Sequence, residues 1–457
     1  MQKTKENKSA GTPETLAGIK VMKFGGTSVG KPHRMHEVAG LITKNKETKI
    51  VVLSAVSGTT NSLVEIGNYL LNGNKEEAKK KIDTLEAQYQ AFVKELVIKP
   101  DALQKAQAVL KEHFEFLNII LRISYNEALN KDILAQGELL STKLFSIYLD
   151  EKGISHALLP ALDFMSIDAN DEPQVDVIRE KLIAVLQQQE GKTLFITQGY
   201  ICRNWRGEVD NLKRGGSDYS ASLIAAAIRA TVCEIWTDIS GMHNNDPRIV
   251  SKTIPVDQLS FDEAAELAYF GAKILHPASI WPAQQYKIPV KLLNTMEPDA
   301  RGTSIVEQAA SAGVKAVAAK DSITAINIRS SRMLLAYGFL RKVFEVFEKY
   351  RTPIDMITTS EVAVSVTIDS DIALNDIVRE LESFSSVSVD RGQTIVSIVG
   401  NEIADQPGTL KNVFESIKHV NVRMVSFGGS AHNISILVES KDKVAVLQAL
   451  NTGLFGL

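Results

Sequence analysis

Glycine and lysine residues in the stretch Lys23–Pro32, KFGGTSVGKP, have types and spacing that suit phosphate binding. The stretch contains G-x-x-x-x-G-K, the pattern of a P-loop, but Pro32 stands where a P-loop carries a Ser or Thr hydroxyl for magnesium. Proline also lacks the amide hydrogen that this position donates near the phosphates. The P-loop is therefore the weaker interpretation of this stretch.

A different phosphate-binding device lies at the other end of the same stretch. Lys23 comes just before the end of an apolar run, Ile19–Phe24, which is typical of a buried strand. Gly25 and Gly26 follow, so the backbone can approach phosphate oxygens without a Cβ in the way. We expect Lys23 to neutralise a phosphoryl group and Pro32 to begin the next helix. A plain strand-to-helix turn with a solvated lysine is the structural alternative.

A second glycine pair precedes a strong helical pattern in the stretch Lys213–Ser220, KRGGSDYS. Ser217 or Asp218 falls at the predicted helix start, where free amides and the helix dipole attract an anion. Arg214 adds a planar guanidinium suited to a carboxylate or a phosphate. Asp218 could orient an ammonium group or help to place Lys23, and a simple helix cap is its structural alternative.

Two further segments place polar groups beside predicted strands. Thr237 and Asp238 leave the sheet where a ligand crevice would lie, and Arg248 supplies positive charge, although a turn at Asp246–Pro247 explains that loop structurally as well. Lys273 stands in an otherwise apolar stretch, and a desolvated lysine rarely lacks a partner. Together these segments favour phosphoryl transfer between ATP and an anionic acceptor, which depends on positioning and charge neutralisation.

The elements that must position these residues alternate between strands and helices over residues 19–312. This alternation predicts an α/β domain with a mainly parallel sheet covered on both faces, and ligands at the carboxyl ends of its strands. Residues 62–150 are almost all helix formers and predict a helical layer, while residues 1–18 are expected to form a flexible tail. The predicted strands are Ile19–Phe24, Lys49–Ser54, Thr193–Gln198, Val232–Thr237 and Ile288–Leu293.

The remaining sequence repeats itself. Gly338–Glu345 and Gly408–Glu415 share five identical residues plus an Arg/Lys exchange at an offset of 70. Each segment has the apolar spacing of an amphipathic helix and lies in a βαββ order, that of a ferredoxin-like unit. We therefore predict two small α+β modules, at 313–391 and 392–457, whose last strands can be shared between them.

Composition narrows the class of partner. The chain has 457 residues, 44% of them hydrophobic and 23% charged, and a formal net charge of -3, which is typical of a globular protein with sizeable cores. This charge balance argues against nucleic-acid and membrane partners and favours a small molecule. Cys202 and Cys233 form neither a disulfide framework nor a metal-ligand pattern, and no signal peptide or membrane-spanning run is present. We therefore expect a cytoplasmic location.

Taken together, the motifs resemble those of the aspartate kinases of the amino-acid kinase superfamily. The matching motifs, in family order over residues 20–305, are KFGGTSV, LSAxxGxTN, QGELLST, RGGSDY, WTD, NDPR and FGAKILHP. The C-terminal repeats resemble tandem ACT modules. The resemblance implies a three-layer αβα kinase fold with two ferredoxin-like ACT modules, without the homoserine dehydrogenase half of bifunctional relatives. It also implies phosphorylation of L-aspartate by Mg-ATP to 4-phospho-L-aspartate, the first step toward lysine, methionine and threonine.

The resemblance implies a role for each matching residue, with Lys23 and Asp218 as the catalytic pair. The residues expected around aspartate are Ser54, Thr60, Glu138, Arg214, Gly216, Ser217 and Asp218. Those expected around ATP are Lys23, Gly25, Gly26, Thr237, Asp238, Arg248 and Lys273. Charge agrees with this division, because Arg214 suits a substrate carboxylate and Glu138 an ammonium group. No magnesium ligand set stands out, and His243 replaces an aromatic residue common in the family, so neither is assigned.

The first ACT-like module resembles that of the lysine-sensitive branch. Asp355 and Glu361 offer anionic groups for the effector's ammonium groups, and the turn before the helical segment Gly338–Glu345 offers amides for its carboxylate. Arg423 stands in the second repeat where the first has Asp355, so only the first module is expected to bind a cationic effector. The structural alternative is that Asp355 and Glu361 are solvated loop charges. ACT sheets also imply a homodimer or a dimer of dimers. The expected effector contacts are Met333, Gly338, Phe339, Leu340, Asp355, Thr359, Ser360 and Glu361.

Two alternative functions remain. A glutamate or acetylglutamate kinase would share the glycine-rich sites but not the duplicated C-terminal modules together with WTD and RGGSD. A non-catalytic amino-acid sensor with a decayed kinase half is the other alternative. The presence of Lys23, Glu138, Arg214 and Asp218 argues against such decay.

Overall fold

The chain folds into two compact units. The computed structural model describes residues 18–212, 215–271, 275–310, 312–329 and 337–457. The first unit comprises Met1–Gly241 and Ala278–Glu307, and the second comprises Met242–Pro277 and Gln308–Leu457. No helix of the described residues combines the length and the apolar character needed to cross a bilayer.

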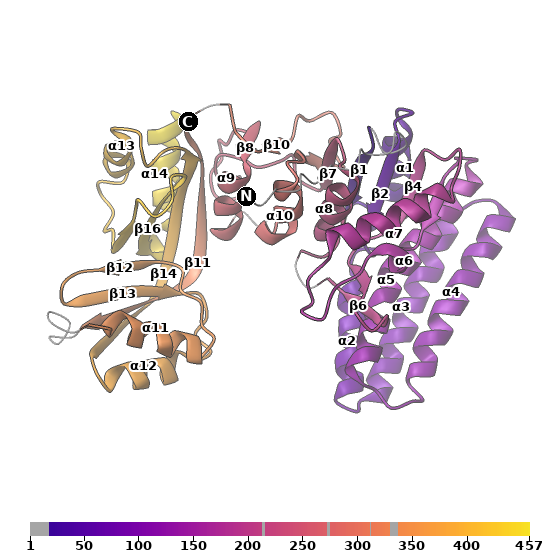
Figure 1. Ribbon diagram of the computed structural model, residues 1–457, viewed down its shortest axis with the longest axis horizontal. Helices are drawn as coiled ribbons and strands as arrows, with labels where there is room; N and C mark the ends of the chain where they lie inside the picture. Colours follow the sequence, from indigo (N-terminus) through magenta and orange to yellow (C-terminus); the bar gives the residue numbers. More distant parts are fainter. Residues whose placement is uncertain (1–17, 213–214, 272–274, 311, 330–336) are drawn as a thin grey trace, which may run out of the picture. The chain divides into compact units, whose positions relative to one another are not determined.

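A mainly parallel sheet forms the centre of the first unit (Figure 1). Its strands in this unit are β1 (Lys20–Phe24), β2 (Lys49–Leu53), β3 (Ala157–Leu159), β4 (Leu194–Gln198), β7 (Val232–Thr237), β9 (Val290–Asn294) and β10 (Thr303–Val306). They lie in the order β3-β4-β2-β1-β7-β9-β10, and the β9–β10 pair is antiparallel. A small separate hairpin consists of β5 (Ile201–Arg203) and β6 (Val209–Asn211). The predicted α/β class is confirmed.

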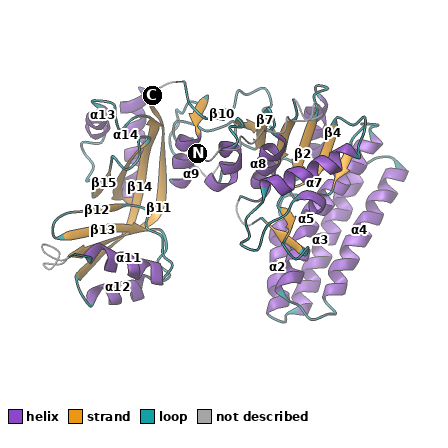
Figure 2. Cartoon of the chain, in the orientation of Figure 1, coloured by secondary structure: helices purple, strands orange, loops and turns teal. Residues whose placement is uncertain are grey.

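Helices cover both faces of this sheet. The helical layer predicted for residues 62–150 is present as four helices, which Figure 2 shows as a bundle. The helices of the first unit are α1 (Pro32–Thr43), α2 (Thr59–Leu71), α3 (Lys75–Leu96), α4 (Pro100–Ile120), α5 (Glu127–Glu151), α6 (Ala161–Phe164), α7 (Val175–Gln187), α8 (Gly216–Ile228) and α10 (Pro277–Gln285). Pro32 is the first residue of α1, as expected, so it belongs to a helix start and not to a defective P-loop.

Strand alternation decides which β1 side chains face the site. Met22 and Phe24 are buried in the large core formed with α1 to α5. Because successive side chains of a strand point to opposite faces, Lys23 points to the other face, where α8 packs on β1. Phe24 pairs with Leu53 of β2 and with Trp236 of β7, so the three strands end level with one another. The segments that follow these strands therefore start at a common edge of the sheet.

The second unit is built on a six-stranded antiparallel sheet in the order β12-β13-β11-β14-β16-β15. Its strands are β11 (Gly313–Arg329), β12 (Ile357–Thr359), β13 (Ala363–Ile368), β14 (Ser386–Asn401), β15 (Met424–Ser426) and β16 (Asn433–Glu439). Its other elements are β8 (Gln258–Ser260), α9 (Phe261–Tyr269), α11 (Phe339–Lys349), α12 (Leu374–Glu382), α13 (Thr409–Ser416), a short 3₁₀ turn (Ser440–Asp442) and α14 (Lys443–Phe455).

The two long strands belong to both repeats. The second half of β11, residues 324–329, pairs with β13 of the first repeat. The first half of β11 pairs with the part of β14 that also pairs with β16 of the second repeat. The second repeat thus takes its fourth strand from residues that precede the first repeat's helix.

Glycine begins the main helix of each repeat. Gly338 and Gly408 are the N-caps of α11 and α13, with φ of 85° and 89°. This left-handed conformation favours glycine, which explains why both copies of the repeat carry it. The apolar residues of Ile354–Ile357 are typical of a strand, but β12 (Ile357–Thr359) begins only at the last of them. The backbone amide of Asp355 donates to the carbonyl of Thr367, but that of Met356 donates to the Thr367 hydroxyl, which interrupts the regular ladder.

Candidate active site

A buried lysine–aspartate pair lies at the common strand edge. Lys23 Nζ on β1 is 2.6 Å from Asp218 Oδ1 in the first turn of α8. The two side chains are 11% and 17% exposed, so the pair is largely shielded from water. The aspartate fixes the position of the ammonium group, whose remaining N–H groups can donate to another anion.

The glycines after β1 leave room around this lysine. A Cβ at Gly25 would lie 3.3 Å from Lys23 Nζ, and a Cβ at Gly26 would lie 3.1 Å from the carbonyl oxygen of Ala55. A side chain at either position would therefore crowd the ammonium group or the loop after β2. The loop is also ordered internally, because the amides of Ser28 and Val29 donate to the Gly25 carbonyl.

Two serine hydroxyls link the loop after β2 to the start of α8. Ser54 Oγ donates to Ser217 Oγ at 2.9 Å. A Cβ at Gly199, directly after β4, would lie 2.4 Å from Ser217 Oγ, so only glycine allows α8 to approach here. Gly199 is a site residue that the sequence analysis missed, although a glycine directly after a predicted strand was the available signal. Gly216 begins α8 with φ of 51°.

Glu138 on α5 reaches the same loop from the helical layer. Its Oε1 accepts a hydrogen bond from the Ala55 amide at 3.2 Å. Its Oε2 is buried and has no hydrogen-bond partner among the described residues. Burial raises the pKa of Glu138 to about 8. A buried carboxyl group with one unsatisfied oxygen is suited to receive a cationic group.

Thr60 lies in the first turn of α2, beyond the same loop. It is partly buried, and the N-cap before its helix is Gly58, with φ of 82°. Its neighbour Thr59 is buried against the helical layer, where its hydroxyl lies 2.8 Å from the hydroxyl of Tyr89. Of the two adjacent threonines, Thr60 is thus the more exposed one.

The end of β7 supplies the predicted nucleotide contacts Thr237 and Asp238. Thr237 Oγ1 donates to Asp238 Oδ1 at 3.1 Å, and the Thr237 carbonyl accepts from the Thr295 amide. Thr295 Oγ1 is in turn 2.7 Å from Ser28 Oγ of the glycine-rich loop. Ser28 and Thr295 were also missed, because their contact spans 267 residues and no local pattern indicates it.

Several predicted site residues lie elsewhere. Arg214, Lys273 and Met333 lie outside the described residues, so their roles stay predictions. Arg248 belongs to the second unit, where its 83% exposed side chain forms a bidentate pair with Asp246, and this pair lowers the pKa of Asp246. His243 Nδ1 lies 2.9 Å from Thr253 Oγ1. Burial lowers the pKa of His243.

The predicted effector residue Asp355 already has two partners. Its side chain is 2% exposed, and Oδ1 lies 2.7 Å both from Lys320 Nζ and from the Tyr269 hydroxyl that donates to it. Lys320 also pairs with Asp369. Asp355 Oδ2 is buried without a hydrogen-bond partner within the described part of the chain. The other described effector candidates are Gly338, the buried Phe339 and the exposed Leu340, Thr359, Ser360 and Glu361.

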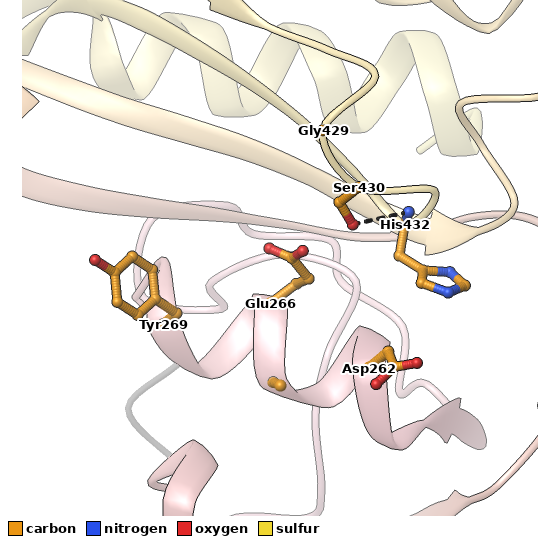
Figure 3. A pocket seen from close by; sticks show the side chains of 7 residues that line it. Asp262, Glu266, Tyr269, Gly429, Ser430 and His432 are labelled. Carbon is orange, nitrogen blue, oxygen red and sulfur yellow. Dashed lines mark hydrogen bonds between the residues drawn. The ribbon is translucent and has the colours of Figure 1, made fainter. Parts of the chain in front are cut away.

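A cavity of about 540 Å³ opens within the second unit (Figure 3). One face of α9 lines it with Asp262, Glu266 and Tyr269, and the loop before β16 lines it with Ser430 and His432. Glu266 accepts a hydrogen bond from the Asn433 amide group. None of the residues assigned from the sequence lines this cavity. In the described ranges no group of three His, Cys, Asp or Glu residues could hold a metal ion.

Comparison with known proteins identifies similar sequences and structures. The family model described as "Amino acid kinase family" matches residues 18–294, and an ACT domain model matches residues 396–454. Lysine-sensitive aspartokinase 3 of Escherichia coli is 33% identical over 452 residues, covering 96% of this chain and 100% of that protein. The chloroplastic aspartokinase 1 of Arabidopsis thaliana is 34% identical, covering 95% of this chain and 80% of that protein. The structure of E. coli aspartokinase III with aspartate and ADP matches at a TM-score of 0.80 and 33% identity, covering 96% of this chain and 100% of that one.

Proposed function

The chain belongs to the aspartokinases of the amino acid kinase family, and we propose on this premise that it phosphorylates L-aspartate with ATP. The product is 4-phospho-L-aspartate, at the first step of lysine, methionine and threonine biosynthesis. The similar E. coli enzyme has been solved with aspartate and ADP, which supports this choice of substrates. The observation that carries the proposal is the buried, half-satisfied carboxyl group of Glu138 at the same strand edge as the Lys23–Asp218 pair.

Each described group has a simple task in this reaction. Glu138 Oε2 receives the ammonium group of aspartate, and the hydroxyls of Ser54 and Ser217, with Arg214, hold its α-carboxylate. Lys23 neutralises charge on the phosphoryl group during transfer. The attacking carboxylate is already ionised near neutral pH, so it forms the new O–P bond as the bond to ADP breaks, and no general base is required. This accounts for a site built from positioning and charge alone.

The nucleotide binds through predicted contacts from several segments. Gly25 and Gly26 allow close approach of the phosphates, Thr237 and Asp238 follow β7, and the cations Arg248 and Lys273 complete the set. Mg²⁺ accompanies ATP, because this ion takes most of its ligands from phosphate oxygens and water and needs only one or two carboxylates. The proposal thus requires no dedicated metal cluster of the protein.

A coupled assay tests the catalytic proposal. Trapping the acyl phosphate with hydroxylamine should give aspartyl hydroxamate only when ATP and aspartate are both present. Product from glutamate or acetylglutamate instead would identify a different amino-acid kinase, and no product from any of them would favour the non-catalytic sensor. Parallel measurement of ADP release checks that trapping itself is not limiting.

We also propose feedback inhibition by L-lysine at the first ACT module, in a homodimer or dimer of dimers. The similarity to a lysine-sensitive relative and the unpartnered, buried Asp355 Oδ2 support this assignment. The effector's ammonium group adds a contact at Oδ2, while Oδ1 keeps its bonds to Lys320 and Tyr269.

Replacement of Asp355 by asparagine should weaken lysine inhibition by about tenfold or more, because a hydrogen bond to a charged group contributes about 1.5–3 kcal/mol. The measurement is the lysine concentration for half-maximal inhibition. Asp369→Asn is the matched control, since Asp369 pairs with the same Lys320, and it should leave inhibition near that of the wild type. Equal inhibition of the Asp355 variant and the wild type would reject this effector site.

A further inference from the structure

The loop after β7 contains two buried asparagines that the proposed reaction does not use. Asn244 and Asn245 precede Asp246 and Arg248 in the sequence NNDPR, and both asparagines are buried. Burying an amide side chain costs free energy unless its donors and acceptors are satisfied. The partners of these two side chains therefore indicate what the loop is built to contact.

Asn244 is bonded through all of its main-chain and side-chain polar groups. Its Nδ2 donates to Asn451 Oδ1 at 3.0 Å, and its Oδ1 accepts from the Ile254 amide at 2.7 Å. Its own amide donates to the Ile254 carbonyl, and its carbonyl accepts from the Val317 amide on β11. One residue thus ties the loop to itself, to α14 and to the sheet of the second unit.

Asn451 on α14 also has both polar atoms of its side chain hydrogen-bonded. Asn451 is 2% exposed, and its Nδ2 donates to the Lys252 carbonyl at 2.8 Å. One turn earlier on α14, the Leu447 carbonyl accepts from Asn245 Nδ2 at 3.0 Å. Residues four apart share one face of a helix, so α14 presents both groups to the loop. Val250 of the loop is also buried in the core that contains Leu447.

A chain of contacts leads from α14 to the predicted nucleotide-binding arginine. Asn245 bonds α14 through Nδ2, and its Oδ1 accepts from the Asp246 amide at 2.9 Å. The Asp246 carboxylate then accepts from Nε and Nη2 of Arg248. The direction of the exposed guanidinium is thereby set by a buried anchor on the second repeat.

We propose that α14 of the second ACT module positions the nucleotide-binding loop, with Asn451 and Asn245 as positioning residues. This inference rests on the proposed function, because it takes Arg248 as a contact of ATP. The second repeat then contributes to substrate binding in the absence of any effector, through one face of its last helix.

The test is Asn451→Ala in the full chain. Loss of the amide bond between Asn451 and Asn244 should raise the KM for ATP by about tenfold, with the KM for aspartate unchanged. The ADP dissociation constant, measured by calorimetry, should rise by a similar factor. Asn451→Ser, which is smaller but keeps a hydroxyl, provides a milder variant should the alanine variant fold poorly, and it should show the same selective effect more weakly.

Ser435→Ala is the matched control for general destabilisation. Ser435 is buried in the same module, and its Oγ lies 2.8 Å from Ser397 Oγ, away from the loop. Its variant should lose thermal stability while the KM for ATP and the ADP affinity stay at wild-type values. An unchanged ADP affinity in both Asn451 variants, or an equal loss in the Ser435 variant, would overturn the positioning role. Absence of aspartate-dependent product in the wild type would instead contradict the proposed function, and the ADP measurement would still decide the role of Asn451.

Discussion

Replacement of Lys23 by alanine is expected to lower kcat by about 10²–10³-fold, the loss typical of removing one preorganised charge-stabilising donor. The effect falls on kcat because the lysine stabilises charge that develops during phosphoryl transfer. The Lys23 side chain is largely buried at the end of the sheet, and among the described residues its single ion pair is the one with Asp218, so the fold should persist. Steady-state kinetics with both substrates saturating measures the effect, and circular dichroism checks the fold.

Lys20→Ala provides a control on the same strand. Lys20 also carries ion pairs, to Glu47 and Glu234, but it lies at the opposite end of β1 from the site. Its variant should keep wild-type kcat. Asp218→Asn, combined with Lys23→Ala, removes the carboxylate left unpaired by the single change and separates that penalty from the loss of catalysis. A kcat within a few-fold of the wild type for Lys23→Ala would refute its catalytic role.

Replacement of Glu138 by glutamine is expected to raise the KM for aspartate by about 10²-fold. Breaking a buried hydrogen-bonded charge pair costs about 2–5 kcal/mol, and glutamine preserves the shape of the side chain while removing its charge. Glu151→Gln is the matched control, because Glu151 is a buried glutamate on the same helix that bonds the amides of Ile98 and Lys99. It should leave the KM for aspartate unchanged, and an equal KM in the Glu138 variant would exclude the ammonium contact.

The pH dependence of substrate binding provides an independent readout of Glu138. Its pKa of about 8 in the free protein means that the carboxyl group is mostly protonated at pH 7. Because the ammonium group of aspartate requires the carboxylate form, the apparent affinity for aspartate should rise with pH until about pH 8 and then level off. The same raised pKa favours the folded state at low pH, and this contribution is lost as pH rises from about 4.5 to about 8. The glutamine variant should show neither trend.

Local sequence patterns predicted the parts of the site that depend on neighbouring residues. Lys23 with its two glycines could be recognised because strand ends, glycine and charge are adjacent in the sequence. The strand alternation that directs Lys23 away from the helical core follows from the same short stretch. Family motifs added Glu138, which no periodicity would have selected from a long helical layer.

Contacts between distant segments could not be predicted. The Ser28–Thr295 bond, the approach of Ser217 to Gly199 and the link from Asn244 to Asn451 depend on the sheet order and on helix packing, which composition does not encode. Asp355 shows the same limit, because its charge was evident but its pairing with Lys320 was not. The sequence predicted Asp355 as a carboxylate free to bind an effector, whereas its Oδ1 already contacts Lys320 and Tyr269.

The two long strands of the C-terminal sheet, β11 and β14, limit which segments of this protein can be transferred to another protein. Because β11 and β14 each run through both repeats, cutting the chain between residues 391 and 392 divides a continuous strand. A graft of either repeat alone would leave half of each long strand beside a foreign neighbour, with unpaired backbone groups at the junction. Any segment transplanted into another enzyme must therefore contain both repeats together, at least residues 313–457.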